Sequence, residues 1–174
     1  MELSCLHTQP HEGRRLRTRT EFPLPLHKWV SVIEAPLYGQ VLPAECTDEE
    51  LANMLQDVER ITKAIDSPIG WVTDVSNILH ATPRQRRMYA ESDARLRDLD
   101  RKWCSGTAVV CCSPFTRGIV TAVHWITPPV YPYKIFGNRH EGERWARQQL
   151  ITRGINISAD PMSLESEINQ TLKR

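Results

Sequence analysis

Short segments rich in β-branched and aromatic residues alternate with longer amphipathic segments along most of this chain, and that alternation limits the folds it can adopt. Five segments have the composition of strands: 29–33, 38–42, 69–75, 107–112 and 133–136. Three longer segments carry helix signals: 47–65, 83–103 and 139–153. Strands separated by helices of this length indicate an α/β domain with a mostly parallel sheet, preceded here by an N-terminal β-hairpin.

Capping residues define the two longest predicted helices. Thr47 and Glu50 form a capping-box sequence, and the apolar residues after them recur at helical spacing to make one buried face. Thr82 followed by Pro83 is a strong helix start, and Ser105-Gly106 is expected to end that second helix. Its apolar stripe is narrow, which predicts a wide solvated face; the stripe consists of Tyr89, Leu96, Leu99 and Trp103.

Local patterns disagree about the segment between the fourth and fifth strands. Residues 113–118 have the composition of a loop. In residues 119–126 the β-branched side chains favour a strand, whereas the spacing of Ile119, Val120, Val123 and Ile126 also fits one face of a helix.

The 174 residues, 40% hydrophobic and 25% charged, suit one globular domain with tails. We place this domain at residues 29–154, between an N-terminal tail (1–28) and a C-terminal tail (155–174) with a short helix after Asp160-Pro161. The first tail is expected to be mobile and basic through Arg14, Arg15, Arg17 and Arg19. No stretch approaches the roughly 20 apolar residues that span a bilayer, and no secretory signal is apparent.

The chain contains five cysteines, an odd number without regular spacing: Cys5, Cys46, Cys104, Cys111 and Cys112. There is no C-x-x-C pair, so a disulfide scaffold, a zinc ribbon and a thioredoxin-type redox site are all disfavoured. This usage predicts a cytoplasmic protein. Cys111 and Cys112 follow an apolar run and are predicted to be small hydrophobic residues of a buried strand.

The hairpin start, the acidic capped helix and a strand that ends in Asp74-Val75-Ser76 resemble the STAS domain, the fold of bacterial anti-sigma-factor antagonists. Four further features resemble its SpoIIAA-like (STAS/SEC14) relatives: the Pro83 helix, Ala108-Val109-Val110, Tyr133-Lys134-Ile135-Phe136, and the terminal helix with Glu143 and Trp145. The resemblance covers residues 29–153. It implies a single STAS/SpoIIAA-like α/β domain in which residues 119–126 are helical.

STAS antagonists carry a D-x-S-x-V strand and then an Asp-Ser pair whose serine is phosphorylated. Asp74, Ser76 and Ile78 match the first part, but Thr82-Pro83 stands where the Asp-Ser pair would be. The resemblance therefore implies a ligand or switch loop that lacks the usual phosphorylated serine. We assign this loop to Asp74, Ser76, His80 and Thr82. A role as helix N-cap explains Thr82 without any regulatory function.

No motif for a cofactor, a metal or catalysis is present. The eight glycines form neither G-x-x-x-x-G-K-[ST] nor G-x-G-x-x-G, and H-E-x-x-H and G-x-S-x-G are absent. We therefore expect no catalytic residues, no metal site and no cofactor. A hydrolase that uses Asp74, Ser76 and a histidine (His80, His124 or His140) is the weakest hypothesis, because nothing in the spacing favours a triad.

Charge is distributed unevenly although the net charge is only +1. Residues 41–66 contain seven acids and two bases, whereas residues 83–103 contain seven bases and four acids. Two acids of the basic helix are spaced to pair with bases four residues later, on its solvated face. These pairs are Asp93–Arg97 and Asp98–Lys102. Arg84, Arg86 and Arg87 remain at the helix N-terminus, where positive charge opposes the helix dipole. We predict that these three arginines bind a partner.

The leading hypothesis is a non-enzymatic regulatory or scaffolding domain that acts through protein–protein contacts, with a partner that has an acidic surface. The alternative, from the SEC14 side of the resemblance, is a carrier or sensor of a small apolar or anionic ligand. The small net charge gives no strong case for nucleic acid. The sequence leaves the oligomeric state open, a homodimer included.

Overall fold

The structure, a computed structural model, describes residues 25–159. Its elements in chain order are β1 (Val30–Glu34), β2 (Leu37–Val41), α1 (Asp48–Ala64), β3 (Ile69–Asp74), α2 (Pro83–Trp103), β4 (Cys104–Val110), α3 (Pro114–Ile126), β5 (Tyr133–Phe136) and α4 (Arg139–Thr152). The predictions for the basic N-terminal run and for a helix after Asp160 lie outside the described residues.

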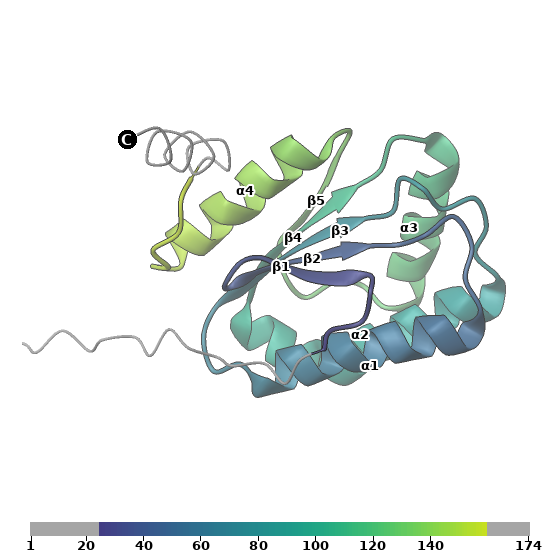
Figure 1. The fold of residues 1–174 in the computed structure, drawn as a ribbon, viewed down its shortest axis with the longest axis horizontal. Coiled ribbons are helices and arrows are strands. Elements are labelled where there is room, and N and C mark those ends of the chain that lie inside the picture. Colours follow the sequence, from purple (N-terminus) through teal and green to yellow (C-terminus); the bar gives the residue numbers. More distant parts are fainter. Residues whose placement is uncertain (1–24, 160–174) are drawn as a thin grey trace, which may run out of the picture.

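One five-stranded sheet organises the chain, with its strands in sequential order from β1 to β5. β1 and β2 form an antiparallel hairpin, and the β2–β3, β3–β4 and β4–β5 pairs are parallel (Figure 1). The predicted fold class, an α/β domain with a mostly parallel sheet and an N-terminal hairpin, is confirmed. The hairpin turns at a cis peptide bond between Ala35 and Pro36.

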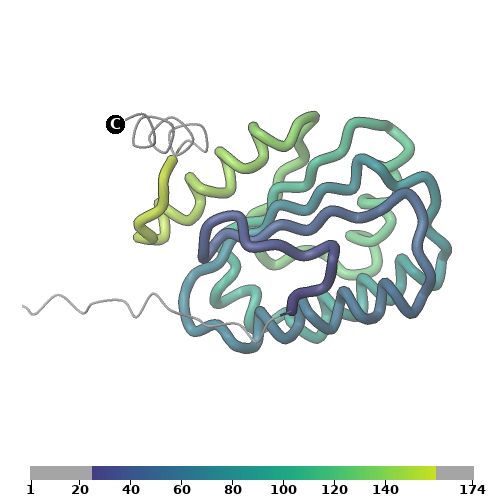
Figure 2. Tube along the Cα trace, in the orientation of Figure 1, coloured from purple at the N-terminus to yellow at the C-terminus, as the bar shows by residue number. Residues whose placement is uncertain are grey.

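Helices cover both faces of the sheet. α4 packs on one face, against β3, β4 and β5, and α1 and α2 pack side by side on the other (Figures 1 and 2). α3 packs on α2 and lies at the end of the molecule where the parallel strands finish. The sheet therefore lies between two layers of helix, which explains why the inner strand β4 is buried along its whole length.

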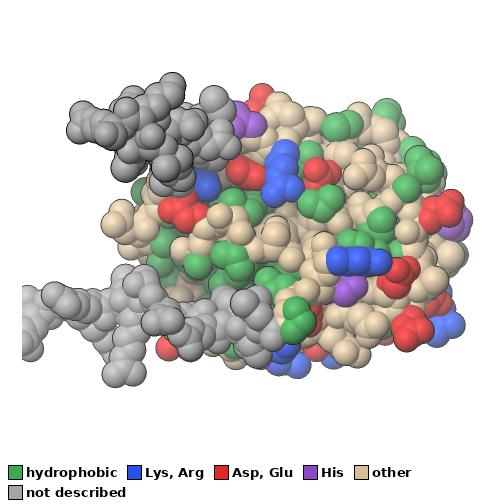
Figure 3. All heavy atoms as spheres, in the orientation of Figure 1, with side chains coloured by type: hydrophobic (Ala, Val, Ile, Leu, Met, Phe, Trp, Pro, Cys, Tyr) green, Lys and Arg blue, Asp and Glu red, His purple; other side chains and the backbone are tan. Residues whose placement is uncertain are grey.

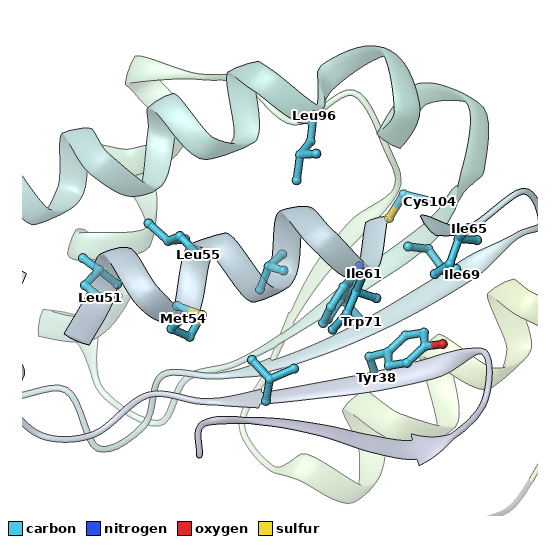
Figure 4. Packing of buried hydrophobic residues seen from close by; sticks show 12 residues of the cluster. Tyr38, Leu51, Met54, Leu55, Ile61, Ile65, Ile69, Trp71, Leu96 and Cys104 are labelled. Atoms are coloured by element: carbon cyan, nitrogen blue, oxygen red, sulfur yellow. The ribbon is translucent and has the colours of Figure 1, made fainter. Parts of the chain in front are cut away.

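The larger core lies between the sheet and the α1–α2 pair. The predicted apolar face of α1 is buried there, with Met54 and Ile61 almost inaccessible to solvent, and it meets Tyr38 and Trp71 from the sheet (Figure 4). The Thr47–Glu50 capping box begins this helix as predicted. N-terminal to β1, Leu26 packs against the same core.

Two element boundaries differ from the sequence predictions around β4. The strand begins at Cys104, so Ser105-Gly106 belongs to the strand and does not form a turn after α2. Gly106 is needed because α4 approaches closely: a Cβ there would lie 3.0 Å from both the Trp145 ring and the Gln149 side chain. The strand ends at Val110, which leaves Cys111 buried beyond it and Cys112 exposed. The prediction that both thiols are buried in the strand is therefore wrong for Cys112.

α3 is longer than the sequence analysis indicated. Residues 119–126 are helical, as the family resemblance implied, but the helix already begins at Pro114. Ser113 is its N-cap, and its hydroxyl accepts a hydrogen bond from the Thr116 backbone N–H at 3.0 Å. The predicted loop over residues 113–118 is thus mostly the first turns of α3.

A candidate ligand-binding cavity

A cavity lies between the sheet, α2 and α3, at the carboxyl ends of the parallel strands. Its floor consists of residues at or near those ends: Leu42, Thr73, Val75 and Val109. α3 contributes Ile119, Val120 and Val123 to one wall. Open α/β sheets place ligand sites at this edge, because the connections after the strands diverge there.

The cavity is mainly apolar and has a volume of about 100 Å³. An apolar protein cavity of about 150 Å³ holds benzene, so a ligand with one aromatic ring would fill this cavity and extend into its open mouth. Charged and titratable side chains gather where the cavity meets solvent: Glu45 and His80 are exposed, and Arg86 is partly buried. His124 on α3 also lines the cavity, and burial lowers its pKa. The geometry suits a small molecule with an apolar body.

A smaller cavity of about 30 Å³ adjoins the inner end of the first, with room for about two waters. The two cavities share five lining residues: Thr73, Tyr89, Asp93, Thr107 and Tyr131. The smaller cavity, which we call the inner chamber, also reaches Asp100 further along α2. An apolar outer cavity therefore ends in a polar layer deep in the domain.

Two carboxyl groups line the inner chamber, and no lysine, arginine or histidine does so among the described residues. Burial and the nearby Asp100 raise the pKa of Asp93 to about 7. Burial raises the pKa of Asp100 to about 7 as well. Neither side chain forms a hydrogen bond or an ion pair with another residue in the described part of the chain. Both carboxyl groups are therefore short of stabilising partners when ionised.

Sequence reasoning missed these two acids. It assigned Asp93 to a solvated pair with Arg97, but the structure turns Asp93 inward, and Arg97 donates instead to the Pro128 carbonyl at 3.1 Å. Asp98 pairs with Arg101 rather than with Lys102. The signal was present in the spacing, because positions 89, 93, 96 and 100 recur every three or four residues and so share one helix face.

The predicted switch loop is only partly at the cavity. His80 lines its mouth, whereas Asp74 accepts a 3.0 Å hydrogen bond from the Ser76 backbone N–H and stabilises a local turn. The Ser76 hydroxyl lies 3.5 Å from the Val110 carbonyl oxygen and 3.4 Å from the Cys112 sulfur. No described histidine forms a hydrogen bond with Ser76, so a nucleophile–base pair for hydrolysis is not assembled there.

Thr82 is the N-cap of α2. Its hydroxyl accepts a hydrogen bond from the Gln85 backbone N–H at 3.1 Å, and the Gln85 side chain accepts one from the Thr82 backbone N–H at 2.9 Å. The Gln85 amide also donates to the Cys46 carbonyl at 2.8 Å. This contact ties the start of α2 to the loop before α1 and fixes one wall of the cavity.

The three arginines predicted to bind a partner occupy different environments. Arg84 forms an ion pair with Asp48 on α1 at 3.1 Å. An acid from a neighbouring helix therefore pairs with Arg84, since the first turn of α2 has none. Arg86 lines the cavity. Arg87 is exposed and makes no ion pair with any residue in 25–159. The first turn of α2 contains no acid, as the sequence indicated.

The fold and the cavity together define a single α/β domain with a helix-covered, mostly parallel sheet and a cavity at the carboxyl ends of its strands. No family model matches the chain, and no curated protein matches it. In structure it is similar to an uncharacterized protein from the DUF3478 family with a SpoIIAA-like fold, from Shewanella loihica PV-4. The two share 18% sequence identity and a TM-score of 0.43, over 63% of this chain and 82% of that chain. The fold named for that protein is the one that the sequence resemblance implied.

Within residues 25–159, no helix has both the length and the apolar character needed to cross a membrane. The same residues hold no group of three or more histidine, cysteine, aspartate or glutamate side chains arranged to bind a metal ion.

Proposed function

We propose that this domain binds a small, largely apolar ligand in the cavity between α2, α3 and the sheet, and acts as a carrier or sensor of that ligand without catalysis. The observation that carries this proposal is the cavity itself. It is mainly apolar and open to solvent, and it lies at the edge of the sheet where α/β folds bind ligands. Burying the apolar part of a ligand there would supply the binding free energy.

Two further features support a ligand site rather than a packing defect. The start of α2 is held by the Thr82 capping box and the Gln85–Cys46 contact, so this wall is fixed in place. The opposite wall, α3, buries only Thr116 and Ile119, and its other apolar residues are available to a ligand or to solvent. A rigid wall that faces a lightly packed helix allows a ligand to enter with little rearrangement.

Filling the cavity should weaken ligand binding strongly. Val120→Phe places a larger side chain into the cavity from α3, where Val120 is partly buried. We expect the neutral probe 2-phenylethanol to perturb the NMR signals of cavity residues in the wild type and to bind Val120→Phe at least about tenfold more weakly, a difference of about 1.4 kcal/mol. Native mass spectrometry of protein purified from its host should likewise show a co-purifying small mass with the wild type only.

The matched control is Thr121→Phe, which adds an aromatic ring on the same helix at an exposed position outside the cavity. It should bind the probe as the wild type does. Equal probe binding by Val120→Phe and wild type, with no co-purifying mass in either, would rule out the cavity as a ligand site.

Binding to a protein partner with an acidic surface is a second candidate function, and it is the leading hypothesis from the sequence. Two observations favour it. Arg87 is exposed and unpaired within the described residues, at a helix end that contains no acid. α3 exposes large apolar side chains, with Trp125 82% and Phe115 59% accessible. Figure 3 shows hydrophobic side chains at the surface of the end of the molecule where α3 lies in Figure 1, among charged side chains of both signs.

Under this second candidate, Arg87→Glu should reduce capture of an acidic partner from host lysate by about tenfold, because a truncated arginine at an interface commonly costs more than about 1 kcal/mol. Capture by wild type should also weaken as salt is raised. Arg101→Glu makes the same charge change at the exposed far end of α2 and serves as control. Undiminished capture by Arg87→Glu would exclude this arginine from the interface.

A further inference from the structure

The polar layer at the inner end of the cavity restricts which ligand can bind. Asp93 lines both the outer cavity and the inner chamber, so its carboxyl group is the acidic group that an occupant meets at the inner end, whereas Glu45, the other acid of the outer cavity, lies exposed at the mouth. Asp100 lies two helical turns further on, about 10 Å along the axis of α2. It lines the inner chamber but not the outer cavity. A ligand that fills the outer cavity thus ends against a carboxyl group, with a second one behind it.

Asp100 is an independent indication of a missing partner. Only 7% of this residue is accessible to solvent, and its side chain has no hydrogen bond or ion pair within the described residues. Buried acids in folded proteins are normally paired or hydrogen-bonded. Apart from Asp93, the other side chains of the inner chamber carry no ionisable acid or base of ordinary pKa near neutrality, and no described lysine, arginine or histidine supplies a positive charge there.

The aromatic side chains around Asp93 are also suited to a cation. Tyr89 and Tyr131 line both cavities, and the Tyr89 hydroxyl donates to the Gln40 side-chain oxygen at 2.9 Å. Burial raises the pKa of both phenols, so both stay neutral and do not compete with Asp93 for the positive charge of a ligand. Aromatic rings beside a carboxylate form a common environment for an ammonium group.

We propose that the ligand is a cationic amphiphile: an amine whose positively charged nitrogen pairs with Asp93 at the inner end of the cavity, while its apolar body fills the outer part. This inference rests on the proposed ligand-binding function and specifies the chemistry of that ligand. It keeps the apolar body of the ligand expected from the sequence and replaces the anionic option with a cationic group.

Three probes of nearly equal shape test this proposal: 2-phenylethylamine, which is cationic, 2-phenylethanol, which is neutral, and 3-phenylpropanoate, which is anionic. At pH 8 the wild type should bind the amine at least about tenfold more tightly than the alcohol, and the carboxylate most weakly. Asp93→Asn keeps the shape of the side chain and should bring the amine to the affinity of the alcohol. Asp98→Asn removes the same charge from an exposed position of α2 and should keep the preference.

Lowering the pH provides a measurement that needs no variant. Between pH 8 and pH 5.5 the amine should lose most of its advantage over the alcohol, because both carboxyl groups become protonated. The groups that face them are Tyr89 on the same helix, Cys104 on β4 and Tyr131 before β5, and all three remain neutral in this range. Two histidines, His80 and His124, also line the outer cavity, so the loss must be absent in Asp93→Asn to be assigned to the carboxyl groups.

The outcomes separate the two proposals. Tight binding of the alcohol without any preference for the amine would overturn this inference and leave ligand binding intact. An amine preference that survives in Asp93→Asn, or tightest binding of the carboxylate, would overturn it too. If the wild type binds none of the three probes, the proposed ligand-binding function fails together with the inference.

Discussion

Replacing Asp100 by asparagine is expected to stabilise the protein at pH 8 and to change its stability much less at pH 5. In the folded protein, burial raises the pKa of Asp100 from 3.8 to about 7. A carboxyl group with a raised folded-state pKa binds its proton more tightly in the folded than in the unfolded state. Its contribution to stability is therefore complete below about pH 4 and is lost as the pH rises through about 7.

The size of the effect follows from that shift. One pKa unit corresponds to about 1.4 kcal/mol, and about two units separate pH 5 from a pKa near 7. The gain in unfolding free energy from Asp100→Asn should thus be about 2–3 kcal/mol larger at pH 8 than at pH 5. Relief of the repulsion on Asp93 acts in the same direction, since the Asp100 charge contributes to the raised pKa of Asp93.

Urea denaturation of wild type, Asp100→Asn and Asp98→Asn at both pH values measures this difference. The exposed Asp98→Asn should change stability by no more than about 0.5 kcal/mol at either pH. Other titrating groups, His124 among them, are present in all three proteins and cancel in the comparison. A gain that is equal at pH 5 and pH 8 would mean that Asp100 is not strained by ionisation, and would remove the electrostatic basis for a cationic ligand.

Comparison of two helix starts shows where sequence reasoning succeeded and where it stopped. Thr82-Pro83 was recognised as a cap, and α2 spans Pro83–Trp103 as predicted. Ser113-Pro114 is the same kind of cap, but residues 113–118 have the composition of a loop, and the β-branched residues after them favour a strand. Local capping chemistry was the more reliable signal, since it depends on a few adjacent residues and not on the tertiary environment.

The candidate site was predictable only in part, for a related reason. The edge of the sheet that forms it follows from the order of the elements, and His80 and Arg86 were named from the sequence. Burial of Asp93 and Asp100 depends on how α2 rotates against β4 and on the segment that brings Tyr131 next to them. A charged residue in a helix of alternating charge is normally solvated, so composition favoured the wrong side of α2.

Arg147 represents a further long-range feature that no local pattern revealed. It lies on α4, is only 2% accessible, and its guanidinium donates to the Glu34 carboxylate at the end of β1 and to the Ser158 carbonyl. Its Nε has no hydrogen-bond partner among the described residues. The side chain thus joins the edge of the hairpin, α4 and the segment after α4 through a single buried positive charge.

Replacing Glu34 by glutamine should therefore destabilise the protein strongly, by about 3 kcal/mol, because it leaves the buried guanidinium without a counter-charge. The opposite single change, Arg147→Met, should cost much less, since the Glu34 side chain is 33% accessible and can be solvated by water once it is alone. The double variant Glu34→Gln/Arg147→Met should recover most of the loss, because no buried charge remains. Urea denaturation of the three variants measures these differences, and a loss from Glu34→Gln no greater than that from Arg147→Met would show that the pair behaves as an exposed one, of the kind worth less than about 1 kcal/mol.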